Sequence, residues 1–130
     1  MNLQLQTSFV VLHGARSAQP VRVTPTLYAQ LNRRFHGFKG RSLVALHRFT
    51  KDWPTWERHP AGDELVCLLA GRARLVLRRK SGDRVMQLRK PGAFVIVPRG
   101  VWHTARISVP TRLLFITPGA GTQNRVLPKR

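Results

Sequence analysis

The sequence predicts an all-β domain, built as an antiparallel sandwich or barrel with a short helix near its beginning. Short runs of apolar residues recur at a spacing of roughly 8 to 12 residues, and Gly and Pro separate them. Within most runs, apolar and polar residues alternate, which is typical of a strand with one buried face. Many short strands separated by Gly- and Pro-containing turns favour a sandwich or a barrel.

Length and composition indicate one domain covering residues 1–130. The chain has 130 residues, of which 42% are hydrophobic, and neither a repeat nor a linker interrupts it. No apolar run approaches the roughly 18 residues of a membrane span, and the N-terminus lacks the basic segment of a signal peptide. Cys67, the only cysteine, lies in an apolar run and suits a buried thiol. We therefore expect a cytoplasmic protein that does not enter a membrane.

The net charge is the most unusual property of the chain. It is +18, with 23 basic residues against 5 acidic ones. Such a field attracts nucleic acid, anionic lipid or an acidic ligand. The basic residues are scattered along the sequence, however, and no run exceeds the three at positions 78–80. We therefore expect a solvated Arg-rich surface, leave an anionic ligand open, and consider nucleic acid an unlikely partner.

The first 40 residues predict two short strands and a helix. Residues 8–12 form an apolar run before Gly14, and residues 17–23 suit only an edge strand because Pro20 cannot donate a hydrogen bond to a ladder. Thr24-Pro25 resembles a helix start. Leu27, Leu31 and Phe35 follow at a spacing of four, which predicts a helix over residues 26–35.

The remaining chain predicts a series of strands separated by turns. From Arg41 the hydrophobic period changes to two, and the turns contain Pro, Gly, Asp or Ser. The expected strands are 41–49, 55–59, 64–69, 72–78, 84–88, 94–97, 103–109 and 112–117. The segment after Pro118 shows no periodicity and is expected to be a tail.

Four side chains from two segments are candidates for a metal site. Glu57 and His59 are two residues apart on an extended segment, so they face the same side. Glu64 opens the next strand after a short turn and can lie beside them. His103 follows the turn at Pro98-Arg99-Gly100, which can direct it to the same interior. Carboxylates and imidazoles are ligands for Mn, Fe, Ni and Zn.

These two segments resemble the motifs of the cupin superfamily, of the small single-domain (cupin 2 conserved barrel) type. The first motif is Gly, His-x-His, three or four residues, Glu, six residues and Gly; Glu57-Arg58-His59, Glu64 and Gly71 stand at these spacings. The second motif is Gly, five residues, Pro-x-Gly, two residues, His, three residues and Asn. Here the matching positions are Gly92, Pro98, Gly100 and His103.

The resemblance implies a double-stranded β-helix (jelly-roll) barrel over residues 41–118, with an N-terminal strand and helix extension at 1–40 and a tail at 119–130. It implies a divalent metal held by Glu57, His59, Glu64 and His103. It also implies a homodimer, because small cupins commonly pair through sheet edges. Three positions depart from the motifs: Lys51 replaces the leading Gly, Ile107 the closing Asn, and Glu57 the first ligand His.

The exchange of His for Glu57 leaves three alternatives for the site. A second carboxylate makes the ligand set harder and favours Mn or Fe, with Zn and Ni remaining open. Glu57 can instead pair with an Arg, which leaves His59, Glu64 and His103 as a three-residue site. The third alternative is a degenerate site without metal, in which the two carboxylates share a proton or an Arg.

Other residues near the motifs have less specific roles. His47, Trp56 and Trp102 are candidates for lining a ligand pocket, although packing is the simpler interpretation of each. Arg58 and Arg99 alternate with the ligand positions and are expected to point away. Asp63 is expected in a turn, and it would exchange roles with Glu64 if the register slipped by one residue.

Three functions remain open. The first is a metal-dependent enzyme acting on a small molecule, such as an oxygenase or an isomerase, as the resemblance permits. The second is a non-catalytic module that binds or senses a small molecule, with an anionic one among the candidates. The third is a basic protein that contacts nucleic acid. The fold does not decide among them, because one barrel hosts many chemistries.

Overall fold

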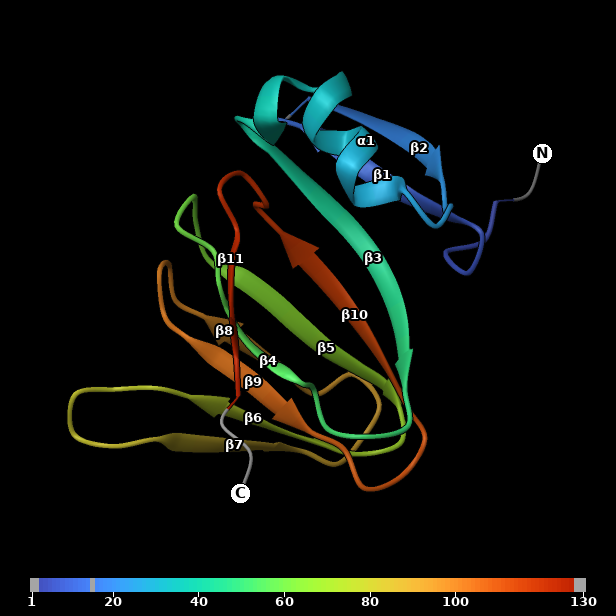
Figure 1. The fold of residues 1–130 in the computed structure, drawn as a ribbon. Helices are drawn as coiled ribbons and strands as arrows, with labels where there is room; N and C mark the ends of the chain where they lie inside the picture. Colours follow the sequence, from blue (N-terminus) through green and yellow to red (C-terminus); the bar gives the residue numbers. More distant parts are fainter. Residues whose placement is uncertain (1–2, 15, 128–130) are drawn as a thin grey trace.

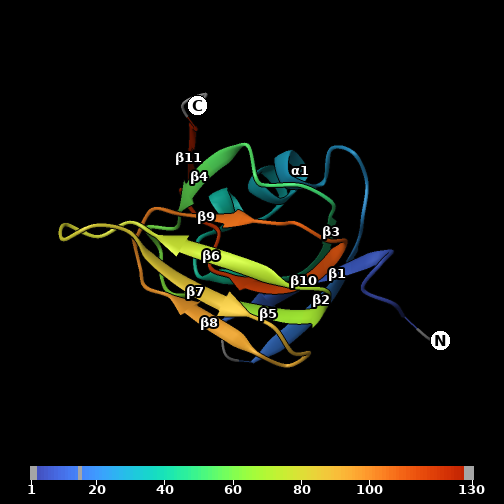
Figure 2. The same ribbon diagram turned by 90° about the horizontal axis from the view of Figure 1, so that it is seen from below.

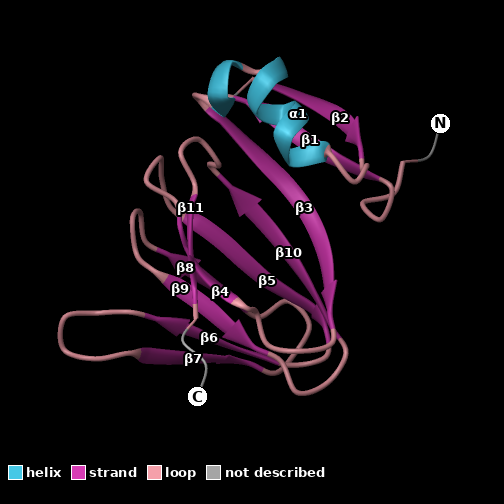
Figure 3. Ribbon diagram, in the orientation of Figure 1, coloured by secondary structure: helices cyan, strands magenta, loops and turns pink. Residues whose placement is uncertain are grey.

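The protein folds into two antiparallel β-sheets that face each other, with one helix packed at one end (Figure 1). The computed structural model describes residues 3–14 and 16–127. Most elements are strands, and all strand pairs are antiparallel (Figure 3). The elements are β1 (Ser8–His13), β2 (Ser17–Arg22), α1 (Leu27–Arg34), a 3₁₀ turn (His36–Phe38), β3 (Arg41–Phe49), β4 (Thr55–Arg58), β5 (Glu64–Ala70), β6 (Ala73–Leu77), β7 (Arg84–Leu88), β8 (Phe94–Val97), β9 (His103–Arg106), β10 (Thr111–Thr117) and β11 (Gln123–Val126).

The six strands β2-β1-β3-β10-β5-β8 form one sheet, called sheet A, and the five strands β11-β4-β9-β6-β7 form the other, called sheet B (Figure 2). Consecutive strands often lie in different sheets, as the crossings from β5 to β6 and from β7 to β8 show. This arrangement confirms the predicted jelly-roll barrel. Strand β2 lies at the edge of sheet A, where Pro20 needs no ladder hydrogen bond, as expected.

The main apolar core fills the space between the two sheets. It contains fully buried side chains from both, including Val66 and Leu68 of β5, Leu75 of β6 and Leu113 of β10. These positions alternate with residues that face outward, which is how the period-two patterns of the sequence produce one shared interior.

A second apolar cluster attaches the N-terminal extension to sheet A. Leu27 and Leu31 of α1 pack with Phe9, Val11 and other buried residues of β1 and β3. The helix therefore covers the inner face of sheet A at the end where β1 and β3 pair, beyond the main core (Figure 1). The spacing of four between the buried residues of α1 is the spacing that predicted the helix.

The turn between β5 and β6 carries the chain from sheet A to sheet B and requires glycine. Gly71 has a φ of +84°, and a Cβ placed on it would lie 2.3 Å from the carbonyl oxygen of Pro110. Both the backbone conformation and the close approach therefore exclude a side chain at this corner.

Three features differ from the sequence expectations. The strand expected over residues 103–109 ends at Arg106, as β9. The segment after Pro118, expected to be a tail, includes β11, which pairs with β4 from Gln123↔Arg58 to Val126↔Thr55. All four residues of β11 are exposed, so the segment lacks the buried alternation that reveals a strand. The helix is also shorter than residues 26–35 by one residue at each end. Across the described residues, every helix is too short or too polar to span a bilayer.

Candidate metal centre and its cavity

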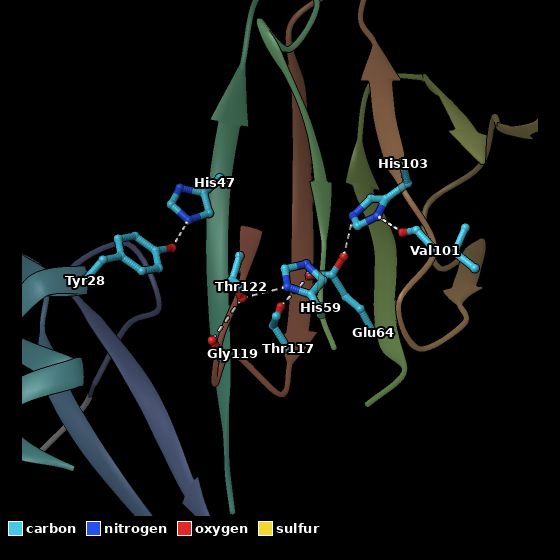
Figure 4. Close-up of polar contacts among 9 residues, drawn as sticks. All are labelled: Tyr28, His47, His59, Glu64, Val101, His103, Thr117, Gly119 and Thr122. Atoms are coloured by element: carbon cyan, nitrogen blue, oxygen red, sulfur yellow. Dashed lines mark hydrogen bonds and ion pairs between the residues drawn. The ribbon is translucent and has the colours of Figure 1, made fainter. Parts of the chain in front are cut away.

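The four candidate ligands come from three strand segments that meet inside the barrel, and Figure 4 draws three of them: His59, Glu64 and His103. Glu57 of β4 pairs directly with His103 of β9. His59 follows β4 by one residue, and Glu64 is the first residue of β5. His59, Glu64 and His103 are buried, with exposed fractions of 5%, 3% and 0%. The structure therefore brings together side chains that the sequence separates by more than 40 residues.

Glu64 lies between the two histidines. Its Oε1 is 3.1 Å from His103 Nε2, and its Oε2 is 3.2 Å from His59 Nε2 (Figure 4). Neither contact is aligned as a hydrogen bond, and both Nε2 atoms and Oε1 are buried without any hydrogen-bond partner. Thr117 of β10 donates a hydrogen bond to Oε2 and holds the carboxylate in place. Three buried polar atoms thus lie close together without forming hydrogen bonds to one another.

The outer nitrogens of both imidazoles are held by the protein. His103 Nδ1 lies 3.1 Å from the carbonyl oxygen of Val101, which can only accept, so this nitrogen carries the proton. Thr122 donates its hydroxyl proton to Gly119 and therefore accepts from His59 Nδ1 at 2.8 Å. In the neutral imidazoles, both Nε2 lone pairs then point toward the Glu64 carboxylate. Such fixed tautomers are typical of metal-binding histidines.

The convergent atoms suit a divalent cation. Ligand atoms of Glu57, His59 and His103 lie within 4.8 Å of one another. Glu64 is not part of that cluster in its present conformation, but its carboxylate contacts both His59 and His103. Donors about 2.1 Å from an ion are roughly 3 Å apart when adjacent in an octahedron, which matches the contacts of Glu64. Two lone pairs facing a carboxylate repel unless a proton or a metal ion lies between them. The residues therefore fit a metal.

The charges at this centre are strongly coupled. Burial alone would raise the pKa of Glu64, but its contacts with His103 and His59 outweigh that effect and lower the pKa to about 2. Burial would lower the pKa of His103, and the Glu64 contact raises it instead. Burial and repulsion by Glu64 raise the pKa of Glu57. In the absence of metal, a proton on His103 therefore stabilises the Glu64 carboxylate.

A cavity of about 710 Å³ leads to the centre. Glu57, His59 and Glu64 line it at one end, and α1 lines it at the other. Apolar side chains from β3, β10 and the segment after Gly37 form much of its wall, with Arg48 and Lys51 among its charged residues. The apolar lining residues include Leu31, Phe38, Leu43, Phe49, Trp53 and Phe115. A cavity of this size holds a small organic molecule.

A hydrogen-bonded pair, Tyr28 and His47, stands in the same cavity away from the candidate ligands. The Tyr28 hydroxyl of α1 lies 2.7 Å from His47 Nε2 of β3 (Figure 4). Tyr28 is 55% exposed as a whole, and its partial burial, together with the charges of Glu57 and Glu64, raises its pKa to about 12. Burial lowers the pKa of His47, so the phenol donates to a neutral imidazole.

The structure corrects two of the predicted pocket residues. His47 lines the cavity, but Trp56 and Trp102 do not. Both lie on the outer face of sheet B, where Arg78 covers Trp56 and Arg58 stacks on Trp102. The reason is alternation, since Glu57 and His103 point inward and their neighbours must point outward. Trp53, in the turn before β4, is the tryptophan that reaches the cavity.

Two other polar residues near the motifs, Arg58 and Asp63, lie where the sequence predicted them. Arg58 bonds to Gln123 of β11 on the outside. Asp63 accepts a hydrogen bond from the backbone of Arg99 at 2.8 Å and is a turn residue, so Glu64 is the inward carboxylate. At the position of the missing Asn, Ile107 is buried, and its backbone N–H donates to Asp52 at 2.7 Å.

Sequence reasoning did not single out three residues of the site: Thr117 and Thr122, which bond to candidate ligands, and Tyr28, which lines the cavity. Thr117 shares the inward alternation of Leu113 and Phe115, so the strand period could have identified it. Thr122 lies in the segment without periodicity, and only the return of β11 beside β4 brings it to His59. Tyr28 depends on where α1 docks, which no local pattern encodes.

Comparison of sequences finds no relative: no family model matches the chain, and no curated protein matches it. Comparison of structures finds many. A cupin-2 domain protein from Shewanella frigidimarina has a TM-score of 0.51 at 19% identity, covering 59% of this chain and 70% of that one.

Two longer proteins are similar over a smaller part of their length. An oxalate oxidase has a TM-score of 0.53 at 15% identity over 62% of this chain and 44% of its own. Oxalate decarboxylase from Bacillus subtilis has a TM-score of 0.53 at 18% identity over 66% of this chain and 23% of its own. The present chain thus matches less than half of either. Two facing antiparallel sheets, both motifs and these neighbours together show that the protein has the fold of the cupin superfamily, as its motifs predicted.

Proposed function

We propose that this protein holds a divalent transition metal with Glu57, His59, Glu64 and His103, and that its cavity admits a small organic ligand to that metal. One observation carries the proposal: two buried imidazole nitrogens and a buried carboxylate oxygen converge without hydrogen-bond partners, while the opposite edges of both rings are held by the protein. With two carboxylates in the set, Mn or Fe is favoured over softer metals.

The chemistry of the cavity indicates the kind of ligand. Its apolar wall suits the carbon skeleton of a small molecule, and Arg48 and Lys51 favour a negative charge on it. A carboxylate or another oxygen donor could then reach the metal, as oxygen is a common donor to Mn and Fe. The names of the two oxalate enzymes with the same fold agree with an acidic ligand. The volume of about 710 Å³ leaves room for a larger acid than oxalate.

The residues of the chain have distinct parts in such a site. Val101 and Thr122 hold the imidazoles so that their lone pairs face inward, and Thr117 orients the Glu64 carboxylate. Tyr28 and His47 offer a polar contact to the far end of a ligand. A bound Mn or Fe ion would supply Lewis-acid or redox chemistry, as an oxygenase or isomerase requires.

A binding or sensing module without metal is the second candidate, and the contacts of Glu64 favour it. At 3.1 and 3.2 Å from the two imidazoles, the carboxylate is stabilised by protonated histidine alone. In that case the cavity would take an acidic ligand directly. Metal content distinguishes the two candidates.

We also propose that the chain forms a homodimer through the outer face of sheet A. Directly paired residues form an unbroken apolar row across five strands: Val10, Val44, Ile116, Leu65 and Ile96. Leu46, Leu114, Cys67 and Phe94 form a second row beside it. Phe94 is 58% exposed and Ile96 46%. A second copy related by a two-fold axis is self-complementary to such a face and would cover it.

Metal content of protein purified without added metal tests the proposed centre. Wild type and Glu57→His should carry close to one equivalent of transition metal, because imidazole replaces the carboxylate as a ligand. His59→Ala should lose it, with at least about a hundredfold weaker binding. His47→Ala is the matched control, since it removes an imidazole from the same cavity away from the centre. Equal metal in wild type and His59→Ala would contradict the assignment.

A further inference from the structure

The outer face of sheet B gathers arginines that are scattered along the sequence. On β4, β6 and β9, the inward residues belong to the core or the metal centre, so their neighbours face outward. Arg74 of β6 stands directly opposite Arg106 of β9. Arg58 and Arg78 lie on the same face. The basic residues of this face are Arg58, Arg72, Arg74, Arg78, Arg89, Arg106 and Arg125.

This face has almost no acidic compensation. Within the described part of the chain, the one ion pair on it joins Arg78 to Asp83 at 3.7 Å, and both side chains are largely exposed. Like charges directly opposite in an antiparallel pair destabilise a sheet, so an anion bound between Arg74 and Arg106 would relieve their repulsion. A groove of about 370 Å³ runs beside this pair and is lined also by Arg72, Arg89, Gln87 and Ser108.

Planar aromatic and guanidinium groups continue the face toward β11. Arg58 and Arg125 both stack on Trp102, each with its guanidinium carbon 4.8 Å from the ring centroid. Arg78 lies 4.3 Å from the centroid of Trp56, which is buried although it belongs to neither apolar cluster. Arginines held flat on a sheet in this way present their N–H groups along a surface to phosphate oxygens.

We propose that the outer face of sheet B binds single-stranded nucleic acid, with Arg74 and Arg106 contacting backbone phosphates. A positive surface interleaved with planar groups is how proteins bind single strands without reading their sequence. An anionic membrane fits less well, because the large exposed apolar side chains among the described residues of sheet B are Val85 of β7 and Val126 of β11, at opposite edges of the sheet. The surface lies outside the barrel and does not depend on the metal centre.

The test is fluorescence anisotropy with a labelled single strand of about 20 nucleotides, as RNA and as DNA. Arg74→Gln with Arg106→Gln should weaken binding about tenfold near physiological salt. The plot of log affinity against log salt concentration has a negative slope, and the double variant should make this slope shallower by about 1.4. Each phosphate contact that is lost makes the slope shallower by roughly 0.7. Arg74→Lys with Arg106→Lys keeps the charge and should retain most of that slope.

The matched control is Arg22→Gln with Arg33→Gln. These two arginines are exposed on β2 and α1, away from both sheet B and the cavity, and their removal changes net charge by the same amount. They should leave binding within about twofold of wild type. Equal loss from both double variants would contradict the proposal, since net charge alone would then explain binding. Tighter binding to duplex DNA or to phosphatidylserine vesicles than to the single strand would also overturn it.

Discussion

The two sheets share one interior but have opposite exteriors. The outer face of sheet A is largely apolar, with rows such as Val10, Val44, Ile116, Leu65 and Ile96 that carry no charge. The facing pair Arg48 and Arg112 lies at one end of it. The outer face of sheet B carries seven arginines and one ion pair in the described residues. A net charge of +18 is therefore not spread evenly over the molecule. The inward residues of both sheets form the core and the candidate metal centre, whereas their outward residues form two chemically different surfaces.

This comparison shows why charge must be counted in space. Arg74, Arg106 and Arg125 are far apart in the sequence, and no basic run exceeds three residues. Cross-strand pairing then places them on one side of one sheet. The expectation of scattered charge thus holds along the chain but not on the surface.

The strongest test of the apolar exterior is Phe94→Lys combined with Ile96→Lys. Each wild-type side chain contributes about 1.5 kcal/mol or more when a second copy buries it, so the pair should weaken dimer formation at least about a hundredfold. Light scattering coupled to gel filtration would show the mass falling from dimer to monomer. Val85→Lys on the opposite sheet is the control and should remain dimeric. A wild-type protein that is monomeric in this measurement would contradict the proposed dimer.

One of the crossings that join the two sheets is the turn at Gly71, between β5 and β6. Gly71→Ala should lower the free energy of unfolding by about 3 kcal/mol, because the methyl group meets the Pro110 carbonyl in a left-handed backbone conformation. Gly92→Ala has a similar φ, +93°, with nothing within 4 Å of the added Cβ, and should cost about 1 kcal/mol. Urea denaturation measures both. Equal losses would mean that the close approach is unimportant.

Salt should affect the two faces in opposite directions, with a smaller effect on the apolar one. Screening weakens the repulsion between two chains of charge +18, so dimer affinity should rise a few-fold between low and high salt. Binding of a single strand should fall steeply over the same range. Sedimentation velocity and anisotropy at matched salt concentrations report the two trends. A dimer that dissociates as salt rises would place charged contacts, rather than apolar ones, in its interface.

The sequence predicted the fold and the interior better than the surfaces. Strand alternation is a local property, so the inward positions of Glu57, His59 and Leu75 followed from spacing alone. The turn glycines and prolines located the strand ends for the same reason. The convergence of His103 with β4 came from motif spacing, because no local pattern specifies which strands become neighbours.

What could not be predicted depends on long-range pairing. Strand β11 has four exposed residues and is held by its register with β4, which no hydrophobic period reveals. Its return brings Thr122 to His59, and the docking of α1 brings Tyr28 to His47. Trp56 and Trp102 are pocket candidates in the sequence because they adjoin the ligand positions, but adjacency in a strand means opposite faces. The simpler interpretation, packing, holds for the buried Trp56.

Titration of metal-free protein with Mn²⁺ by calorimetry, in buffers of different ionisation enthalpy, tests the proposed centre most directly. The Glu64 contact raises the pKa of His103, so in the metal-free protein this imidazole keeps its proton above the ordinary value of about 6.5. Binding at neutral pH should therefore release protons, and affinity should fall as pH decreases, because protons compete for His103. His103→Ala should abolish both the binding and the proton release. Mn²⁺ binding without proton release, or binding that survives His103→Ala, would contradict a metal at this centre.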